Sequence, residues 1–170
     1  MTHPLVLQLR FARSEFVRGL DGVTEEEGRR RFEPMNSISW MVAHLTWQEQ
    51  RYWLTAPQGV ILVPEVNELA GYGQPATTPS LAAMWAAWRK VTQAADVNLE
   101  TLNSQTLTTH LVIRGETLPE SLGSMLRRMT YHYWYHIGES QAVRQLLGHK
   151  NLPDFVGAIH AEAPYIRETD

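Results

Sequence analysis

Two histidines, His132 and His136, stand four residues apart in the aromatic segment YHYWYHIGESQ, residues 131–141. If this segment is helical, each side chain turns by about 100° from the last, so both imidazoles and the carboxylate of Glu139 point to the same side. Two imidazoles one helical turn apart can bind a single metal ion. The structural alternative makes His132 a partly exposed residue and His136 a core residue that donates to a backbone carbonyl.

A third histidine, His44, lies in a strongly apolar segment between Trp40 and Trp47. Burying an isolated imidazole there is costly unless it has a polar partner. If this segment packs against the one that carries His136, His44 completes a three-histidine site. Such a site leaves coordination positions for water or substrate, as expected of a catalytic metal. No second histidine stands at ligand spacing in the sequence from any of the others: His3, His110, His149 and His160.

Four further residues are candidates for roles around such a site. Glu139 can orient an imidazole, act as a fourth ligand or act as a general base, and the alternative is a solvated or ion-paired glutamate. Arg51 shares a helical stripe with His44 and suits a substrate carboxylate, although a surface ion pair is the simpler role. Trp47 and Tyr133 are close to the histidines in sequence and can bind an apolar substrate, although aromatic residues mostly serve packing.

Apolar residues recur at helical spacing in four stretches, which predict long helices over residues 5–20, 38–55, 80–102 and 119–148. We place Pro119 at the first turn of the last helix, where its missing N–H costs nothing. The first helix carries charged residues between its apolar positions: Arg10, Arg13, Glu15 and Arg18.

The connections are of two kinds. Residues 56–79 contain many prolines and glycines and predict a long ordered loop that covers one end of the fold and shapes a substrate entrance. Residues 105–118 alternate in polarity and predict a small hairpin with a turn at Arg114-Gly115-Glu116. The fold class is therefore all-α, a four-helix bundle whose long loop between the second and third helices permits a crossover. Its length predicts one domain, residues 1–170.

Composition excludes several classes of function. The formal net charge is -3, which does not favour nucleic acid or an anionic membrane as a partner. Cysteine is absent, so the chain has no disulfide, no thiolate metal site and no cysteine nucleophile. The N-terminal residues predict neither a signal peptide nor a membrane span, and we expect a cytoplasmic protein.

The segments NSISWMVAHLTWQEQRYW, around His44, and YHYWYHIGESQAVRQLLGH, from residue 131, resemble the DinB and YfiT-like superfamily of bacterial metalloenzymes. The resemblance covers most of the chain and implies a four-helix bundle, often a homodimer. It also implies one divalent metal ion, zinc or nickel, bound by His44, His132 and His136. One departure is Glu139, because the superfamily commonly has glutamine there.

The resemblance also implies a reaction. Characterised members include mycothiol-dependent isomerases and thiol S-transferases, in which the metal activates the thiol of a low-molecular-weight cofactor. This is chemically sound, because a divalent cation with a free coordination position favours thiolate over thiol. We therefore predict a metal-dependent thiol S-transferase, or a related hydrolase or isomerase. The alternatives are a non-catalytic bundle that binds a small molecule or a partner helix, and a dimerisation module clamped by metal.

Overall fold

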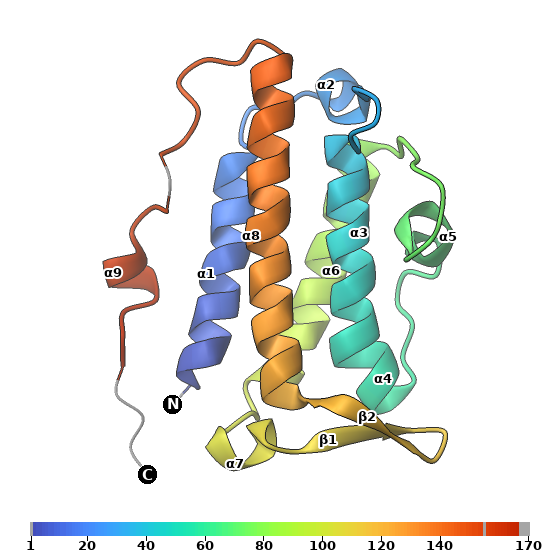
Figure 1. The fold of residues 1–170 in the computed structure, drawn as a ribbon, viewed down its shortest axis with the longest axis vertical. Coiled ribbons are helices and arrows are strands. Elements are labelled where there is room, and N and C mark those ends of the chain that lie inside the picture. Colours follow the sequence, from blue (N-terminus) through green and yellow to red (C-terminus); the bar gives the residue numbers. More distant parts are fainter. Residues whose placement is uncertain (1, 155, 167–170) are drawn as a thin grey trace.

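Four long helices lie side by side in the computed structural model, which describes residues 2–154 and 156–166 (Figure 1). The predicted, mostly helical fold is confirmed, and each predicted helix overlaps one of the four. They are α1 (Pro4–Gly19), α3 (Ile38–Gln50), α6 (Leu81–Leu99) and α8 (Leu122–Leu146).

Serine residues fix where three of these helices begin. The hydroxyls of Ser37, Ser80 and Ser121 accept hydrogen bonds from backbone N–H groups in the first turns of α3, α6 and α8, at 3.2–3.3 Å. Pro119 therefore does not open the last helix, as predicted, but lies in the strand before it. The serine cap, rather than the proline, marks the boundary.

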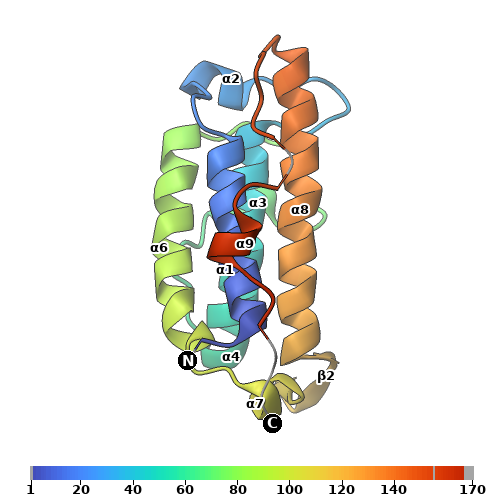
Figure 2. The same cartoon turned by 90° about the vertical axis from the view of Figure 1, so that its left-hand side faces the viewer.

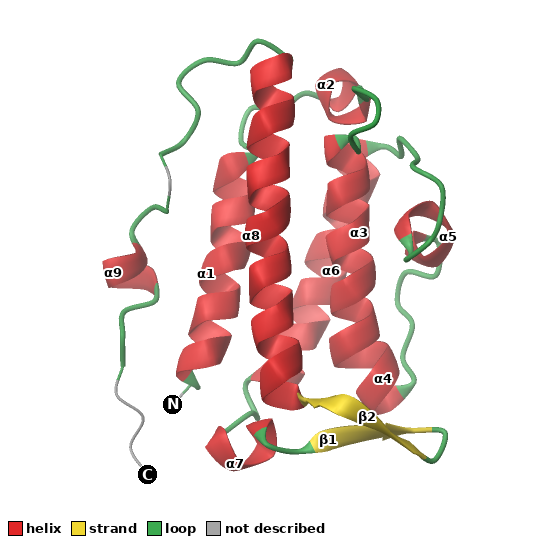
Figure 3. Cartoon of the chain, in the orientation of Figure 1, coloured by secondary structure: helices red, strands yellow, loops and turns green. Residues whose placement is uncertain are grey.

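The connections give α3 and α6 the same direction. In Figure 1, α1 and α8 run upward while α3 and α6 run downward, so the chain must return to the top between them. A π-helical segment, η1 (Arg51–Thr55), and a short helix, α4 (Ala56–Gln58), extend α3 until Gly59 ends it with a φ of 70°. The return segment contains α5 (Val66–Ala70), so the predicted loop over residues 56–79 is partly helical (Figure 3).

Shorter elements close the two ends and one side. The helix α2 (Glu25–Arg29) follows α1 at the upper end, and α7 (Ser104–Leu107) follows α6 at the lower end. The predicted hairpin is present as β1 (His110–Ile113) and β2 (Glu116–Ser121), which are antiparallel.

The C-terminal segment carries α9 (Ile159–Glu162), which lies beside α1 (Figure 2). The side-chain amide of Gln8 donates to the backbone carbonyl of Ala163 at 2.9 Å, and the N–H of Gly157 donates to the carboxylate of Glu15 at 2.8 Å. In the part of the chain that the structure describes, no helix has both the length and the hydrophobicity needed to cross a membrane.

Candidate metal centre

Three imidazoles meet between α3 and α8. His44 comes from the middle of α3, and His132 and His136 come from successive turns of α8. Each offers one ring nitrogen such that all three nitrogens lie within 4.8 Å of one another. The Nε2 atoms of His132 and His136 are 2.9 Å apart. The contact between the two helices, on which the predicted three-histidine cluster depended, is therefore present.

The ring of His44 is held by a backbone carbonyl and two indoles. Its Nδ1 donates to the carbonyl oxygen of Ala70, at the end of α5, over 2.6 Å. The rings of Trp40 and Trp47 stack on it at centroid distances of 4.5 and 5.4 Å. Because Nδ1 carries the proton of this hydrogen bond, the lone pair of Nε2 remains for a metal ion.

Glu139 is placed behind His136. The Nδ1 of His136 donates to one oxygen of Glu139 at 2.7 Å, and the amide of Asn36 donates to the other at 3.3 Å. Burial acts to raise the pKa of Glu139, but the hydrogen bonds from His136 and Asn36 and the charge of His136 outweigh it and lower the pKa. A carboxylate that accepts a hydrogen bond from the Nδ1–H of an imidazole fixes the orientation of the ring, which is the first of the site roles predicted for Glu139.

His132 completes the fit to a metal ion. Its Nδ1 is buried and has no hydrogen-bond partner among the described residues, and its Nε2 faces that of His136. Burial, together with the charges of His136 and His44, lowers the pKa of His132 to about 3, and burial also lowers the pKa of His44. Neutral imidazoles are the form that binds metals, so the donor set suits a divalent cation.

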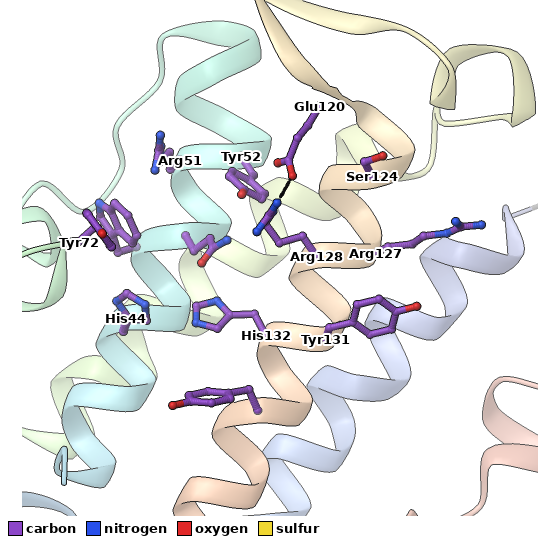
Figure 4. Close-up of a pocket in the computed structure, with 13 residues that line it drawn as sticks. His44, Arg51, Tyr52, Tyr72, Glu120, Ser124, Arg127, Arg128, Tyr131 and His132 are labelled. Carbon is purple, nitrogen blue, oxygen red and sulfur yellow. Dashed lines mark hydrogen bonds and ion pairs between the residues drawn. The ribbon is translucent and has the colours of Figure 1, made fainter.

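A pocket of about 940 Å³ opens beside the cluster, and His44 and His132 form part of its wall. His136, with 4% of its side chain exposed, is not part of the lining and lies deeper. The volume suits a small organic molecule. Figure 4 shows the lining residues. Besides the two histidines, the aromatic residues that line the pocket are Trp47, Tyr52, Tyr72, Tyr131 and Tyr135.

Two of the three predicted substrate contacts line this pocket. Trp47 does so while stacking on His44, and the guanidinium of Arg51 lies 5.4 Å from the centre of the Trp47 ring. Tyr133, by contrast, is fully buried in the core and lies outside the pocket. One residue along a helix turns the side chain by about 100°, so Tyr133 points away from the side that carries His132. Its hydroxyl donates to Glu49 instead.

Several groups around the site were not predicted from the sequence. The carbonyl of Ala70 is a backbone atom and leaves no sequence signal, and Asn36 is 103 residues from Glu139, to which its amide donates. Arg128 was detectable in principle, because it precedes His132 by one helical turn and therefore shares its stripe. The segment predicted to shape the entrance contributes Tyr72 to the pocket.

The sequence matches the model of a known protein family. The family model described as the DinB superfamily matches residues 8–140, a range that contains the three histidines and Glu139. No curated protein matches the sequence.

Proposed function

Because the chain belongs to the DinB superfamily, we propose that it is a divalent-metal-dependent enzyme and, more narrowly, a thiol S-transferase. The observation that carries the proposal is the set of three imidazole nitrogens within 4.8 Å of one another, beside a pocket large enough for an organic substrate. The resemblance to thiol-dependent members supports the reaction type. It also supports a single-domain four-helix bundle that acts as a homodimer.

The histidines have the role of holding the ion. His44, His132 and His136 would bind one zinc or nickel ion and leave further coordination positions for a reactant. When bound, such an ion favours the thiolate form of a thiol or the hydroxide form of a water, and so supplies a nucleophile. The chain has no cysteine, so the thiol must come from a low-molecular-weight co-substrate.

The neighbouring residues orient the ligands and shield them. Ala70 and Glu139 accept hydrogen bonds from the Nδ1–H groups of His44 and His136, which fixes the two rings and leaves their Nε2 lone pairs for the ion. The indoles of Trp40 and Trp47 cover the His44 ring and limit the access of water to it. We assign Glu139 this positioning role rather than that of a general base, because it does not line the pocket.

The proposal is tested by activity. Zinc- or nickel-loaded protein is incubated with mycothiol, glutathione or cysteine and monochlorobimane as the electrophile, alongside simple ester substrates. We expect turnover that is lost on chelation and in His136→Ala, and retained in His160→Ala, whose side chain is exposed and outside the cluster.

Absence of any activity that depends on His136 would contradict the enzyme proposal. If a small ligand then raised the melting temperature equally in wild-type, His44→Ala and metal-free protein, the non-catalytic binding module would be the better account.

A further inference from the structure

An ion pair lies at the wall of the pocket, close to the histidines. Arg128 precedes His132 by four residues, so its Cα lies about 6 Å away along the axis of α8, on the same side of the helix. Its Nε donates to Oε1 of Glu120, in β2, at 2.8 Å, and its Nη2 donates to the same oxygen. Figure 4 shows the guanidinium of Arg128 between α8 and α3, beside Tyr52, whereas Arg127 points away.

The charged residues that line the pocket are mainly cationic. Arg51, Arg127 and Arg128 contribute to the wall, and Glu120 is the one carboxylate among the described lining residues. The pair between Arg128 and Glu120 is accessible to solvent, with 58% and 30% of the two side chains exposed. Exposed ion pairs of this kind are weak, so a ligand can replace one partner at little cost.

The geometry of the pair indicates what Arg128 binds. Both donating nitrogens contact one carboxylate oxygen, although a guanidinium fork can hold the two oxygens of a carboxylate side by side. Aromatic side chains line the same pocket, among them Tyr52, Trp47 and Tyr135. They suit a flat apolar body.

We propose that Arg128 is the anion-binding residue of this pocket, and that the substrate is a small aromatic or unsaturated carboxylic acid. Its carboxylate replaces that of Glu120 on Arg128, and its reactive part extends toward His44 and His132, which line the same pocket. This assignment rests on the proposed function, because it names the class of substrate that the metal site acts on. Glu120 acts as an internal competitor for the same guanidinium.

The test is equilibrium binding of 3-phenylpropanoate, followed by the tryptophan fluorescence of the protein. In wild-type protein we expect binding at least about tenfold tighter than that of the neutral 3-phenylpropanamide, since a charge-assisted pair is lost with the amide. Arg128→Gln should weaken binding of the acid by about tenfold or more, and Arg128→Lys by less. Glu120→Gln should tighten it, because the competitor is removed. Arg127→Gln is the matched control and should change it by less than about twofold.

Several outcomes would overturn the assignment. These are an absence of saturable binding to wild-type protein, equal losses in Arg127→Gln and Arg128→Gln, or weaker binding in Glu120→Gln. Phenyl phosphate that binds more tightly than the carboxylate, with the same dependence on Arg128, would instead assign the site to phosphate esters.

The same titrations separate this proposal from the metal site. Each titration is made with zinc-loaded and with metal-free protein, and the zinc content of every variant is measured. Dependence on Arg128 without metal binding or turnover would count against the proposed enzyme alone. Metal binding without dependence on Arg128 would count against the anion site alone.

Discussion

Two polar clusters lie between the long helices, and they are built in opposite ways. In the first, which we call the arginine cluster, Arg13 of α1 donates from Nε and Nη2 to the two oxygens of Glu49 of α3, both at 2.7 Å. The hydroxyl of Tyr133 donates to Glu49 and accepts from the indole of Trp88, and the third nitrogen of Arg13 donates to Asp96. The exposed fractions of the Arg13 and Glu49 side chains are 5% and 0%.

The second cluster consists of His44, His132 and His136, and its hydrogen bonding is incomplete. Ala70 and Glu139 satisfy the outer nitrogens of His44 and His136, but Nδ1 of His132 has no partner within the described chain. The Nε2 atoms of His132 and His136 face one another, where a cation bound by both would be stabilised. This cluster also borders the pocket of about 940 Å³, whose lining includes no residue of the arginine cluster.

The same fold therefore holds one cluster suited to stability and another suited to metal binding. A buried ion pair with all its hydrogen bonds made is closed to any further ligand, and removing one partner leaves a buried charge. A group of imidazoles whose hydrogen bonding is incomplete contributes less to folding, and its free ring nitrogens can bind a metal ion. Substitutions in the first cluster should therefore lower stability, and substitutions in the second should lower metal affinity.

The largest effect is expected in the arginine cluster. Arg13→Met should lower the free energy of unfolding by about 3–5 kcal/mol, because Glu49 is left charged and buried without its partner. Arg10→Met is the matched control on the same helix, with a side chain 30% exposed and paired to Asp96 and Glu100. Arg10→Met should lower the free energy of unfolding by about 1 kcal/mol or less. Urea unfolding measures the stability of both variants. Similar losses of stability in the two would contradict a special role of the arginine cluster in folding.

The next effect is on metal affinity. His132→Ala should weaken zinc binding by more than about 100-fold, because loss of an outer partner alone costs about 10–100-fold. The metal-free variant should lose about 1 kcal/mol or less of stability, since a buried polar atom without a partner is removed together with the packing of the ring. Competition with a chelator and urea unfolding measure the two quantities. A stability loss as large as that of Arg13→Met would remove the distinction between the clusters.

A smaller effect on zinc affinity is expected from Glu139, which contacts His136. Glu139→Ala should weaken zinc binding by about 10–100-fold, because the Nδ1 of His136 loses its acceptor. Glu139→Gln keeps a side-chain oxygen in reach and should lose less than about tenfold. Competition with a chelator measures the zinc affinity of both variants. Equal losses in both variants would show that the negative charge, rather than the orientation of the ring, is what matters.

The smallest effect tests Tyr133, which is next to His132 in sequence but belongs to the arginine cluster. Tyr133→Phe should cost about 1–2 kcal/mol of stability, because the indole N–H of Trp88 loses its acceptor and Glu49 loses a donor. Zinc affinity and turnover should stay within about twofold of wild type. A loss of turnover without loss of stability would return Tyr133 to the substrate site.

Regular patterns in the sequence were enough to predict the long helices and the side that His132 and His136 share on the last one. The apolar spacing of the four stretches and the four-residue spacing of His132 and His136 both follow from helical geometry. Local boundaries were less predictable, because Pro119 has the same preference for a helix start as for the edge of a strand. The short helices α4 and α5 are too brief to produce a periodic signal.

Contacts between distant segments could not be predicted. The burial of Arg13 depends on Glu49, 36 residues away, and the charged pattern of the first helix does not distinguish it from Arg10. The carbonyl of Ala70 reaches His44 only because the return segment lies beside α3, and the amide of Asn36 reaches Glu139 only because the start of α3 lies beside α8. Such partners depend on the packing of the helices rather than on local sequence.

The central claim is that His44, His132 and His136 bind one metal ion. The most direct test is the metal content of untagged protein after equilibration with zinc or nickel and gel filtration, with His136→Ala and His160→Ala beside it. We predict one ion per chain in wild type and His160→Ala, and none in His136→Ala. An ion retained in His136→Ala, or none in wild type, would contradict the claim.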